Sequence, residues 1–306
     1  MILSIAKWTQ RDFTRDAAIS EKAQLLTISY SHYCEMARLG LDLMKMEYEE
    51  HGYAAGQHVL PLLKARVCGQ EKIISTSSNV TTAHEATNPV NFDEDGQPKK
   101  KAGSPTGTPL LIMPDGNTYS DSWDILNSTG LKPIEERYKP LYDMYVGPLS
   151  RQVIYKFLMK QSNKSSWDKL MTEEGHGAMW SFLWNLGVGS RLTPFLGGTF
   201  AVEDDEAFQL AITRLRTAFD TITETRLKQS KGKYINGNEI SAEDIALVAL
   251  VSPVVSPPEF CKGRFRYILE ELFDSDAEAR AIRTEFRETE VGKYCLDFYR
   301  EYGEMK

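Results

Sequence analysis

A hydroxyl and a thiol stand three residues apart at a predicted helix start. Ser31 directly follows a short apolar run, and Cys34 comes three residues later. Residues at this spacing lie on the same side of a helical turn, so the two side chains would share one pocket. A thiol at a helix N-terminus has a lowered pKa, whereas a serine there is also a common N-cap. The pair therefore indicates either a reactive site or plain helix capping.

Two further short motifs carry polar groups that could face a ligand. Thr108-Pro109 precedes a predicted strand, and Asp121-Ser122 precedes a predicted helix. A cis bond before a proline is uncommon and marks a tight turn, which would fix the backbone of Thr108. Taken alone, Asp121 and Ser122 fit helix capping as well as they fit ligand binding.

Alternating strand and helix patterns must position these residues. Short β-branched and apolar runs predict strands, and apolar residues at every third or fourth position predict helices. Tyr33, Ala37, Leu41 and Met44 give the clearest helical spacing. In chain order we expect a strand over Gln24–Tyr30, a helix from Ser31, a strand over Met46–Glu50, a short helix over Val59–Val67, a strand over Leu110–Met113, a turn at Pro114–Asn117, a return strand at Thr118–Tyr119, and a helix after Asp121-Ser122 that stops at Gly130.

A long polar stretch interrupts this pattern. The segment from Ser75 to Ser104 is rich in Ser, Thr, Asn, Asp, Gly and Pro, and it includes the run Lys99-Lys100-Lys101. It has too few apolar residues to offset the entropy of ordering. We therefore predict a mobile insertion over about 69–104, with a lid or docking segment as the alternative.

The second half of the chain is predicted to be helical from about Lys139. One apolar stripe is spaced 4, 3, 4, 3 along the chain, which is typical of core packing. Ser241 and Asp244 form a capping box before another apolar run. The predicted organisation is an extension over 1–23, a small α/β domain over 24–130 and a larger all-α domain over 139–306. The stripe consists of Phe208, Ile212, Leu215, Phe219 and Ile222.

Composition limits the function classes. The chain has 306 residues, 42% of them hydrophobic, and a net charge of −7, which argues against binding a polyphosphate backbone and hence against nucleic acid. Its four cysteines are scattered and do not form a disulfide framework or a metal-ligand pattern, which indicates a reducing compartment and no metal. No apolar run is long enough to span a bilayer. We expect a cytoplasmic protein with no membrane partner.

These motifs, taken in order, resemble the cytosolic glutathione transferases of the serine or cysteine type. The resemblance rests on Ser31-His32-Tyr33-Cys34, on Thr108-Pro109 and on Asp121-Ser122 followed by Ile125. It extends through the segment Tyr234–Gly237 with its capping box, and through the tail from Val291 to Arg300. The resemblance covers Gln24 to about Tyr302 apart from the insertion. It implies a thioredoxin-like N-terminal domain followed by an all-α helical-bundle domain.

The resemblance implies that glutathione is the co-substrate and brings its own thiol. Lowering the pKa of that thiol by about two units takes about 2.7 kcal/mol of preferential stabilisation of the thiolate. A hydrogen bond from Ser31, together with the helix dipole, could supply it. Cys34 is the alternative catalytic residue, through a mixed disulfide with glutathione. In redox relatives the nucleophile is the first residue of a C-x-x-C pair, and here Ser31 occupies that position.

The other expected contacts with glutathione come from the remaining motifs. Glutathione is an extended peptide, so it can bind along a strand edge through the backbone of Thr108, before Pro109. Ser122 suits the α-carboxylate, and Asp121 suits the α-amino group in the same chain or in the partner subunit. Many members carry a cation before the proline, but Gly107 and Thr108 stand there, and the lysine run at 99–101 is the possible substitute. His32 replaces a common proline, and we expect it to face solvent.

The expected activity is conjugation of glutathione to a small hydrophobic electrophile, as in detoxification, by a homodimer. The electrophile site would come from the second domain, and its aromatic side chains are candidates to line it. Two alternatives stay open, a non-catalytic binding or scaffold protein of this fold and a glutathione-dependent isomerase or thiol reductase that uses Cys34. The candidate lining residues are Tyr142, Tyr145, Trp180 and Trp184.

Overall fold

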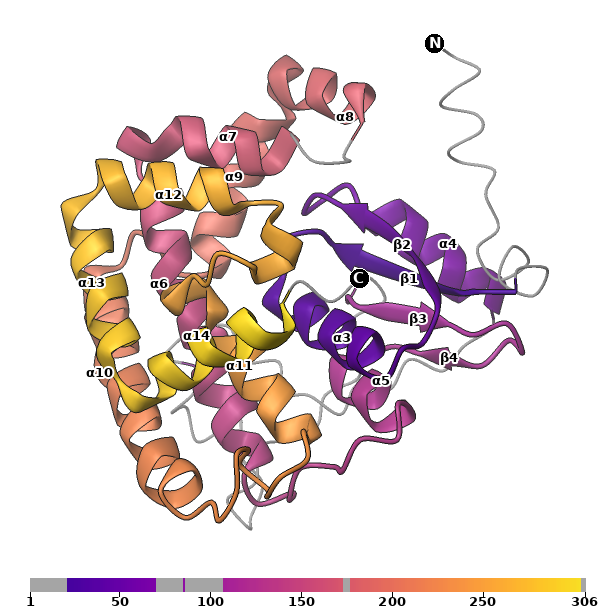
Figure 1. The fold of residues 1–306 in the computed structure, drawn as a ribbon. Helices are drawn as coiled ribbons and strands as arrows, with labels where there is room; N and C mark the ends of the chain where they lie inside the picture. The colour runs from indigo at the N-terminus through magenta and orange to yellow at the C-terminus, as the bar shows by residue number, and fades with distance from the viewer. Residues whose placement is uncertain (1–20, 70–84, 86–106, 173–176, 304–306) are drawn as a thin grey trace.

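The protein is described from a computed structural model, which defines residues 21–69, 85, 107–172 and 177–303 (Figure 1). Most of the predicted N-terminal extension lies outside these residues. So does nearly all of the predicted insertion over 69–104, including the lysine run at 99–101.

A four-stranded mixed sheet forms the N-terminal part, in the order β2-β1-β3-β4. The central strand β1 (Ala23–Ile28) is parallel to β2 (Tyr48–Tyr53) and antiparallel to β3 (Leu110–Ile112). Successive side chains of a strand point to opposite faces, so Leu26 packs with α4 (Val59–Gly69), whereas Leu25 packs with α3 (His32–Leu43) and α5 (Ser122–Ser128). Helices therefore cover both faces of the sheet (Figure 1).

The second strand begins later than the sequence pattern predicted. It spans Tyr48–Tyr53 and not Met46–Glu50. The end of α3 explains the difference, because the amide of Met46 donates to the carbonyl of Leu41 at 2.9 Å and Lys45 has a positive φ of 55°. Met46 is thus part of the turn that closes the helix, and the strand starts after it.

The predicted hairpin and the helix after it are confirmed. β3 returns through a turn to β4 (Thr118–Tyr119), and the amide of Met113 donates to the carbonyl of Asn117 at 2.8 Å. Gly116 and Gly130 both have positive φ, 86° and 84°, the left-handed conformation in which a residue other than glycine is strained. Gly130 follows the end of α5, as the sequence indicated.

Helices make up the rest of the described chain and wrap around the buried helix α11, which packs against α3, α6 and α14 (Figure 1). Every residue of α11 is buried, and Asp244 accepts a hydrogen bond from the Ser241 amide at 2.8 Å, as expected of a capping box. The predicted stripe from Phe208 to Ile222 is buried on α10. The helices are α6 (Gly147–Leu158), α7 (Lys164–Thr172), α8 (Ala178–Leu183), α9 (Gly189–Thr199), α10 (Asp205–Ile222), α11 (Ala242–Val255), α12 (Arg266–Ser275), α13 (Ala277–Glu288) and α14 (Glu290–Tyr302).

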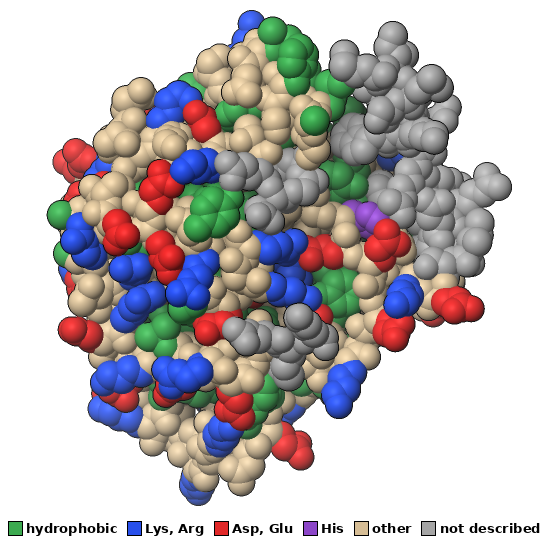
Figure 2. Space-filling model, turned by 45° about the horizontal axis from the view of Figure 1, so that its top comes forward, with side chains coloured by type: hydrophobic (Ala, Val, Ile, Leu, Met, Phe, Trp, Pro, Cys, Tyr) green, Lys and Arg blue, Asp and Glu red, His purple; other side chains and the backbone are tan. Residues whose placement is uncertain are grey.

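The architecture is the predicted one, a thioredoxin-like α/β part followed by an all-α part. The exact division into domains at 130 and 139 stays a prediction. Within the described segments, no helix combines the length and the apolar character needed to cross a membrane. The face shown in Figure 2 carries basic and acidic side chains next to one another over much of its area.

Candidate functional site

Strand register brings the predicted site motifs to one end of the sheet. Leu26 pairs with Leu110, and beyond this pair β1 runs on toward Ser31 while β3 runs back to Thr108. Leu111 pairs with Tyr119, so β4 runs toward Asp121 at the same end. We call this the Ser31 end of the sheet. Ser31 and Asp121, which are 90 residues apart in the sequence, therefore converge because of the mixed strand order.

Ser31 is the N-cap of α3, as the sequence indicated. Its side-chain oxygen accepts a hydrogen bond from the Cys34 amide at 3.4 Å. Ser31 is half-buried. Accepting this bond uses only a lone pair, so the hydroxyl proton can still be donated. The capping role and a role toward a ligand are thus compatible for Ser31.

Cys34 is fully buried inside the same turn. Burial raises the pKa of its thiol, while Arg38 and the hydroxyls of Thr108 and Ser31 lower it by a smaller amount. Because the net direction is upward, the thiol form prevails at neutral pH. Ser31 and Thr108 both act on the pKa of this thiol, so the two motifs lie close together.

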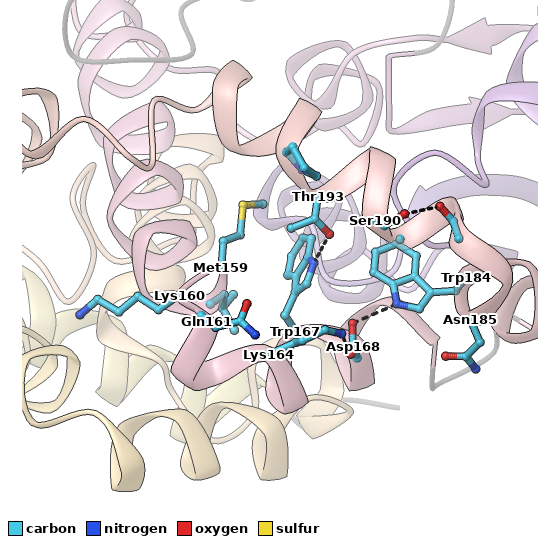
Figure 3. Close-up of a pocket in the computed structure, with 14 residues that line it drawn as sticks. Met159, Lys160, Gln161, Lys164, Trp167, Asp168, Trp184, Asn185, Ser190 and Thr193 are labelled. Atoms are coloured by element: carbon cyan, nitrogen blue, oxygen red, sulfur yellow. Dashed lines mark hydrogen bonds and ion pairs between the residues drawn. The ribbon is translucent and has the colours of Figure 1, made fainter.

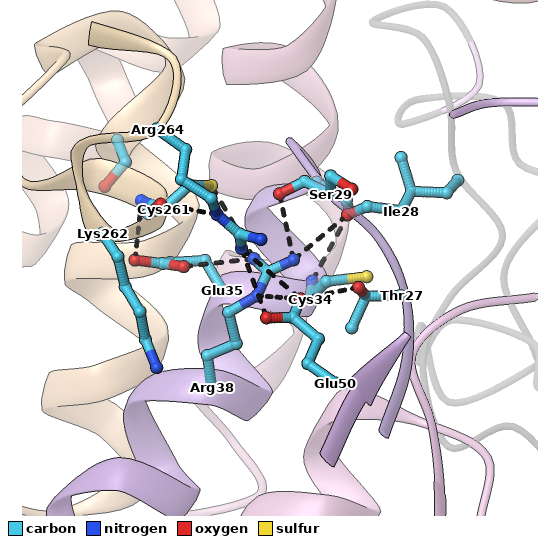
Figure 4. A network of polar contacts seen from close by, with 12 residues as sticks. Thr27, Ile28, Ser29, Cys34, Glu35, Arg38, Glu50, Cys261, Lys262 and Arg264 are labelled. Atoms are coloured by element: carbon cyan, nitrogen blue, oxygen red, sulfur yellow. Dashed lines mark hydrogen bonds and ion pairs between the residues drawn. The ribbon is translucent and has the colours of Figure 1, made fainter. Parts of the chain in front are cut away.

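A buried ionic network fixes the loop that carries Ser31 (Figure 4). Arg38 is 1% exposed and donates to the Ser29 carbonyl at 3.0 Å, to Glu50 at 2.7 Å and to Glu35 at 3.2 Å. Glu35 in turn accepts from the Cys261 amide at 3.0 Å, which ties α3 to the helical part. Arg38 therefore connects the end of β1, β2 and α3 through one guanidinium.

The charge state of this network is well defined at neutral pH. Burial alone would raise the pKa of Glu50, but Arg38, Arg264 and the Thr27 hydroxyl lower it to about 2. Glu50 is thus a carboxylate under physiological conditions, and the buried guanidinium of Arg38 keeps its counter-charge.

Asp121 and Ser122 begin α5 at the Ser31 end of the sheet. Asp121 caps the helix by accepting from the Trp123 amide at 2.8 Å, and both residues are buried, at 7% and 3% exposure. The Trp123 indole donates to Asp143 at 2.7 Å, which anchors α5 to the helical part. The negative charges of Asp121 and Asp143 both act on the Tyr33 hydroxyl, so Asp121 lies near the start of α3.

The bond between Thr108 and Pro109 is cis, as the sequence resemblance implied. Thr108 and Gly107 are half-buried, and Pro109 leads directly into β3. Neither Gly107 nor Thr108 can supply a cation, but Arg66 of α4 donates to the Gly107 carbonyl at 2.8 Å. A guanidinium therefore stands beside this loop, contributed by a helix 41 residues earlier in the chain.

The expectation that His32 faces solvent is wrong. His32 is 4% exposed, and its Nε2 lies 3.0 Å from the carbonyl oxygen of Gly147 in α6. Burial and the nearby Arg151 lower its pKa to about 3, although the Gly147 carbonyl opposes this shift. His32 is therefore neutral and serves as a contact between α3 and α6.

A cluster of one cation and two aromatic side chains, which the sequence pattern did not lead us to predict, lies near Ser31. It consists of Arg151, Tyr155 and Phe200. Arg151 of α6 has its Cζ 5.8 Å from the Tyr33 ring and 4.6 Å from the Phe200 ring. Tyr155 packs edge-on against Phe200 at 4.9 Å, and burial raises its pKa to about 12. A sequence signal existed, since positions 151, 154, 155 and 158 share one helix face and only the first is charged.

The aromatic residues predicted to line an electrophile site lie elsewhere. Tyr142 is fully buried and donates to Glu243 at 3.0 Å, while Tyr145 and Trp180 pack against the core. Trp184 lines a separate cavity of about 380 Å³ among α7, α9 and the turn between α8 and α9 (Figure 3). None of Ser31, Thr108, Asp121 and Ser122 lines that cavity.

Comparison with known proteins gives structural likeness only. No family model and no curated protein matches the sequence. A glutathione transferase from Phanerochaete chrysosporium is 14% identical, with 94% of this chain and 98% of that chain covered and a TM-score of 0.48. The glutathione S-transferase of Ceriporiopsis subvermispora, solved with glutathione, is 16% identical over 92% and 98%, with a TM-score of 0.48.

A third solved structure comes from a bacterium. The glutathione transferase from Pseudomonas putida, with one glutathione disulfide bound per subunit, is 12% identical over 94% of this chain and 98% of that chain, with a TM-score of 0.42. These three structures are similar to this chain in fold.

Proposed function

We propose that this chain is a member of the glutathione transferase superfamily that binds glutathione at the Ser31 end of the sheet and conjugates it to an electrophile. One observation carries the proposal. Strand register brings Ser31, Thr108 and the Asp121-Ser122 pair together, and these are the motifs that the sequence resemblance assigns to glutathione.

In the proposed reaction the glutathione thiol first loses its proton to solvent. The Ser31 hydroxyl donates a hydrogen bond to the resulting thiolate, and the free amides at the start of α3 add favourable electrostatics. The sulfur then forms a bond to an electrophilic carbon, and the leaving group departs with its electron pair. Ser31 keeps its own proton throughout.

The rest of the ligand would lie along the same end of the sheet. The backbone of Thr108 supports hydrogen bonds to the cysteinyl unit, and Ser122 suits the γ-glutamyl carboxylate. Arg66, beside Gly107, supports the glycyl end electrostatically. Burial of Cys34 and the raised pKa of its thiol favour Ser31 over a cysteine mechanism.

Binding is tested by calorimetric titration with glutathione. We expect wild-type protein to bind and Ser122→Ala to lose about tenfold in affinity, the effect of about one hydrogen bond to a charged group. Ser128→Ala is the matched control, because this hydroxyl caps the other end of α5 by donating to Ile125 at 2.7 Å. No binding by the wild type would refute the proposed function.

By the same resemblance we propose a cytoplasmic homodimer. Light scattering should then give twice the chain mass of 34.7 kDa. A monomer mass at micromolar concentration would contradict this part of the proposal.

A further inference from the structure

Among the residues that the structure describes, Arg151 has no anionic partner, and it lies next to the proposed site. It projects from α6, where Tyr33 and Phe200 pack near its guanidinium. Its Nε is buried and makes no hydrogen bond, and no described residue accepts a hydrogen bond from it or pairs with it. A guanidinium has five N–H donors in a planar fork that matches a carboxylate.

The other residues that line the cavity beside Arg151 are uncharged. It lines a small cavity of about 40 Å³, together with Tyr30 and His32 from the N-terminal part and Ile154, Tyr155 and Leu158 from α6. His32 is neutral, because burial and Arg151 itself lower its pKa. The Nε of this half-buried cation is buried without a hydrogen-bond partner, and none of the described residues gives Arg151 a counter-charge, so this environment favours an incoming anion.

The location of Arg151 separates it from the expected glutathione contacts. Tyr30, His32 and Tyr33 place it beside Ser31, but on the side formed by the helical part. The glutathione motifs come from the loops before β3 and after β4, on the sheet. A group held by Arg151 would therefore belong to the second substrate, which would approach the thiolate from the side of the helical part.

We propose that Arg151 is a specificity-determining residue that binds a carboxylate on the second substrate. The proposal rests on the proposed function and names its substrate class, apolar or aromatic electrophiles that carry a carboxylate. Tyr33, Tyr155 and Phe200 supply the aromatic surface, and the cavity admits only a group of a few atoms beside the guanidinium.

A matched pair of electrophiles tests this assignment. We compare kcat/KM for 4-(chloromethyl)benzoate and 4-(chloromethyl)benzamide, which share the reacting carbon and leaving group but differ in charge. Arg151→Gln should lower the value for the benzoate by about tenfold to a hundredfold, the effect of a hydrogen bond to a charged group, and change the value for the benzamide by less than about twofold. Arg151→Lys should restore part of the preference for the benzoate.

Lys156→Gln removes a cation from the same helix that instead pairs with Asp205 at 2.6 Å, and it should leave the preference unchanged. Equal losses with both electrophiles, or no loss with either, would overturn the assignment.

A binding measurement keeps the inference separate from the proposed function. Wild-type protein should bind 4-methylbenzoate at least about tenfold more tightly than 4-methylbenzamide in a calorimetric titration, and Arg151→Gln should abolish this difference. If the wild type shows no preference for the benzoate, the inference fails. If the preference is present but no electrophile is conjugated, the proposed function fails and the anion site stands.

Discussion

His32 is a buried neutral imidazole that makes the start of α3 sensitive to acid. Its Nε2 donates to the Gly147 carbonyl, and its pKa is about 3 in the folded protein, against about 6.5 in the unfolded chain. As the pH falls below the unfolded value, the unfolded chain takes up a proton and the folded protein does not. Stability is therefore present at neutral pH and is lost as the pH falls.

We predict that this group lowers the free energy of unfolding by about 2 kcal/mol between about pH 7 and about pH 5. Urea denaturation of wild type and of His32→Gln over this range measures the effect. The amide of the glutamine can still donate to Gly147 but does not titrate, so the variant should lack this part of the decline. Parallel curves for the two proteins would show that His32 becomes protonated in the folded state.

Residue types at helix starts were predictable, but side-chain surroundings were not. Ser31 and Asp121 cap their helices as their types and positions indicated. The environment of His32 depends on Gly147, 115 residues away, and that of Arg151 on Phe200. Such contacts arise from how helices that are distant in the sequence pack on one another, which local spacing does not encode.

At the scale of elements, the guanidinium of Arg38 joins the end of β1, β2 and α3. We predict that Arg38→Met destabilises the protein by about 3–5 kcal/mol, because buried Glu35 would lose its counter-charge and Glu50 would lose its shorter ion pair. Thermal or urea unfolding measures the loss. Arg300→Met is the control, since Arg300 forms an exposed pair with Asp297, and it should cost less than about 1 kcal/mol.

Equal effects of these two substitutions would show that the network does not hold the loop. Adding Glu35→Gln to Arg38→Met should recover part of the lost stability, because it removes the carboxylate left without a cation, whereas Glu50 keeps its pair with Arg264 at 3.3 Å.

Element types followed from periodicity, whereas boundaries depended on turn geometry. The stripe of α10 and the capping box of α11 are long, regular signals, and both were confirmed. The start of β2 was misplaced because Met46 looks like a strand residue but its amide closes α3. The mixed strand order, which brings the site motifs together, does not follow from the spacing of apolar residues, because that spacing gives element types and not strand neighbours.

At the scale of the whole molecule, buried contacts link the two parts. Glu35 of α3 accepts hydrogen bonds from the Cys261 amide and from the Tyr299 hydroxyl of α14. The Tyr30 ring packs edge-on against Phe265 at 6.0 Å. We therefore predict one cooperative unfolding transition, with far-ultraviolet circular dichroism and tryptophan fluorescence giving the same midpoint. Two separated midpoints would mean that the parts unfold independently.

The central claim is that Ser31 holds the sulfur of bound glutathione as a thiolate. The most direct measurement is the ultraviolet absorbance of that thiolate as a function of pH, for wild type, Ser31→Ala and Ser29→Ala. Ser29 is a matched control, because its hydroxyl lies against Gly52 of β2. We predict that the wild type and Ser29→Ala lower the pKa of the bound thiol by about two units from about 8.5, and that Ser31→Ala loses most of this shift. A Ser31→Ala variant with the pKa of the wild type would contradict the claim.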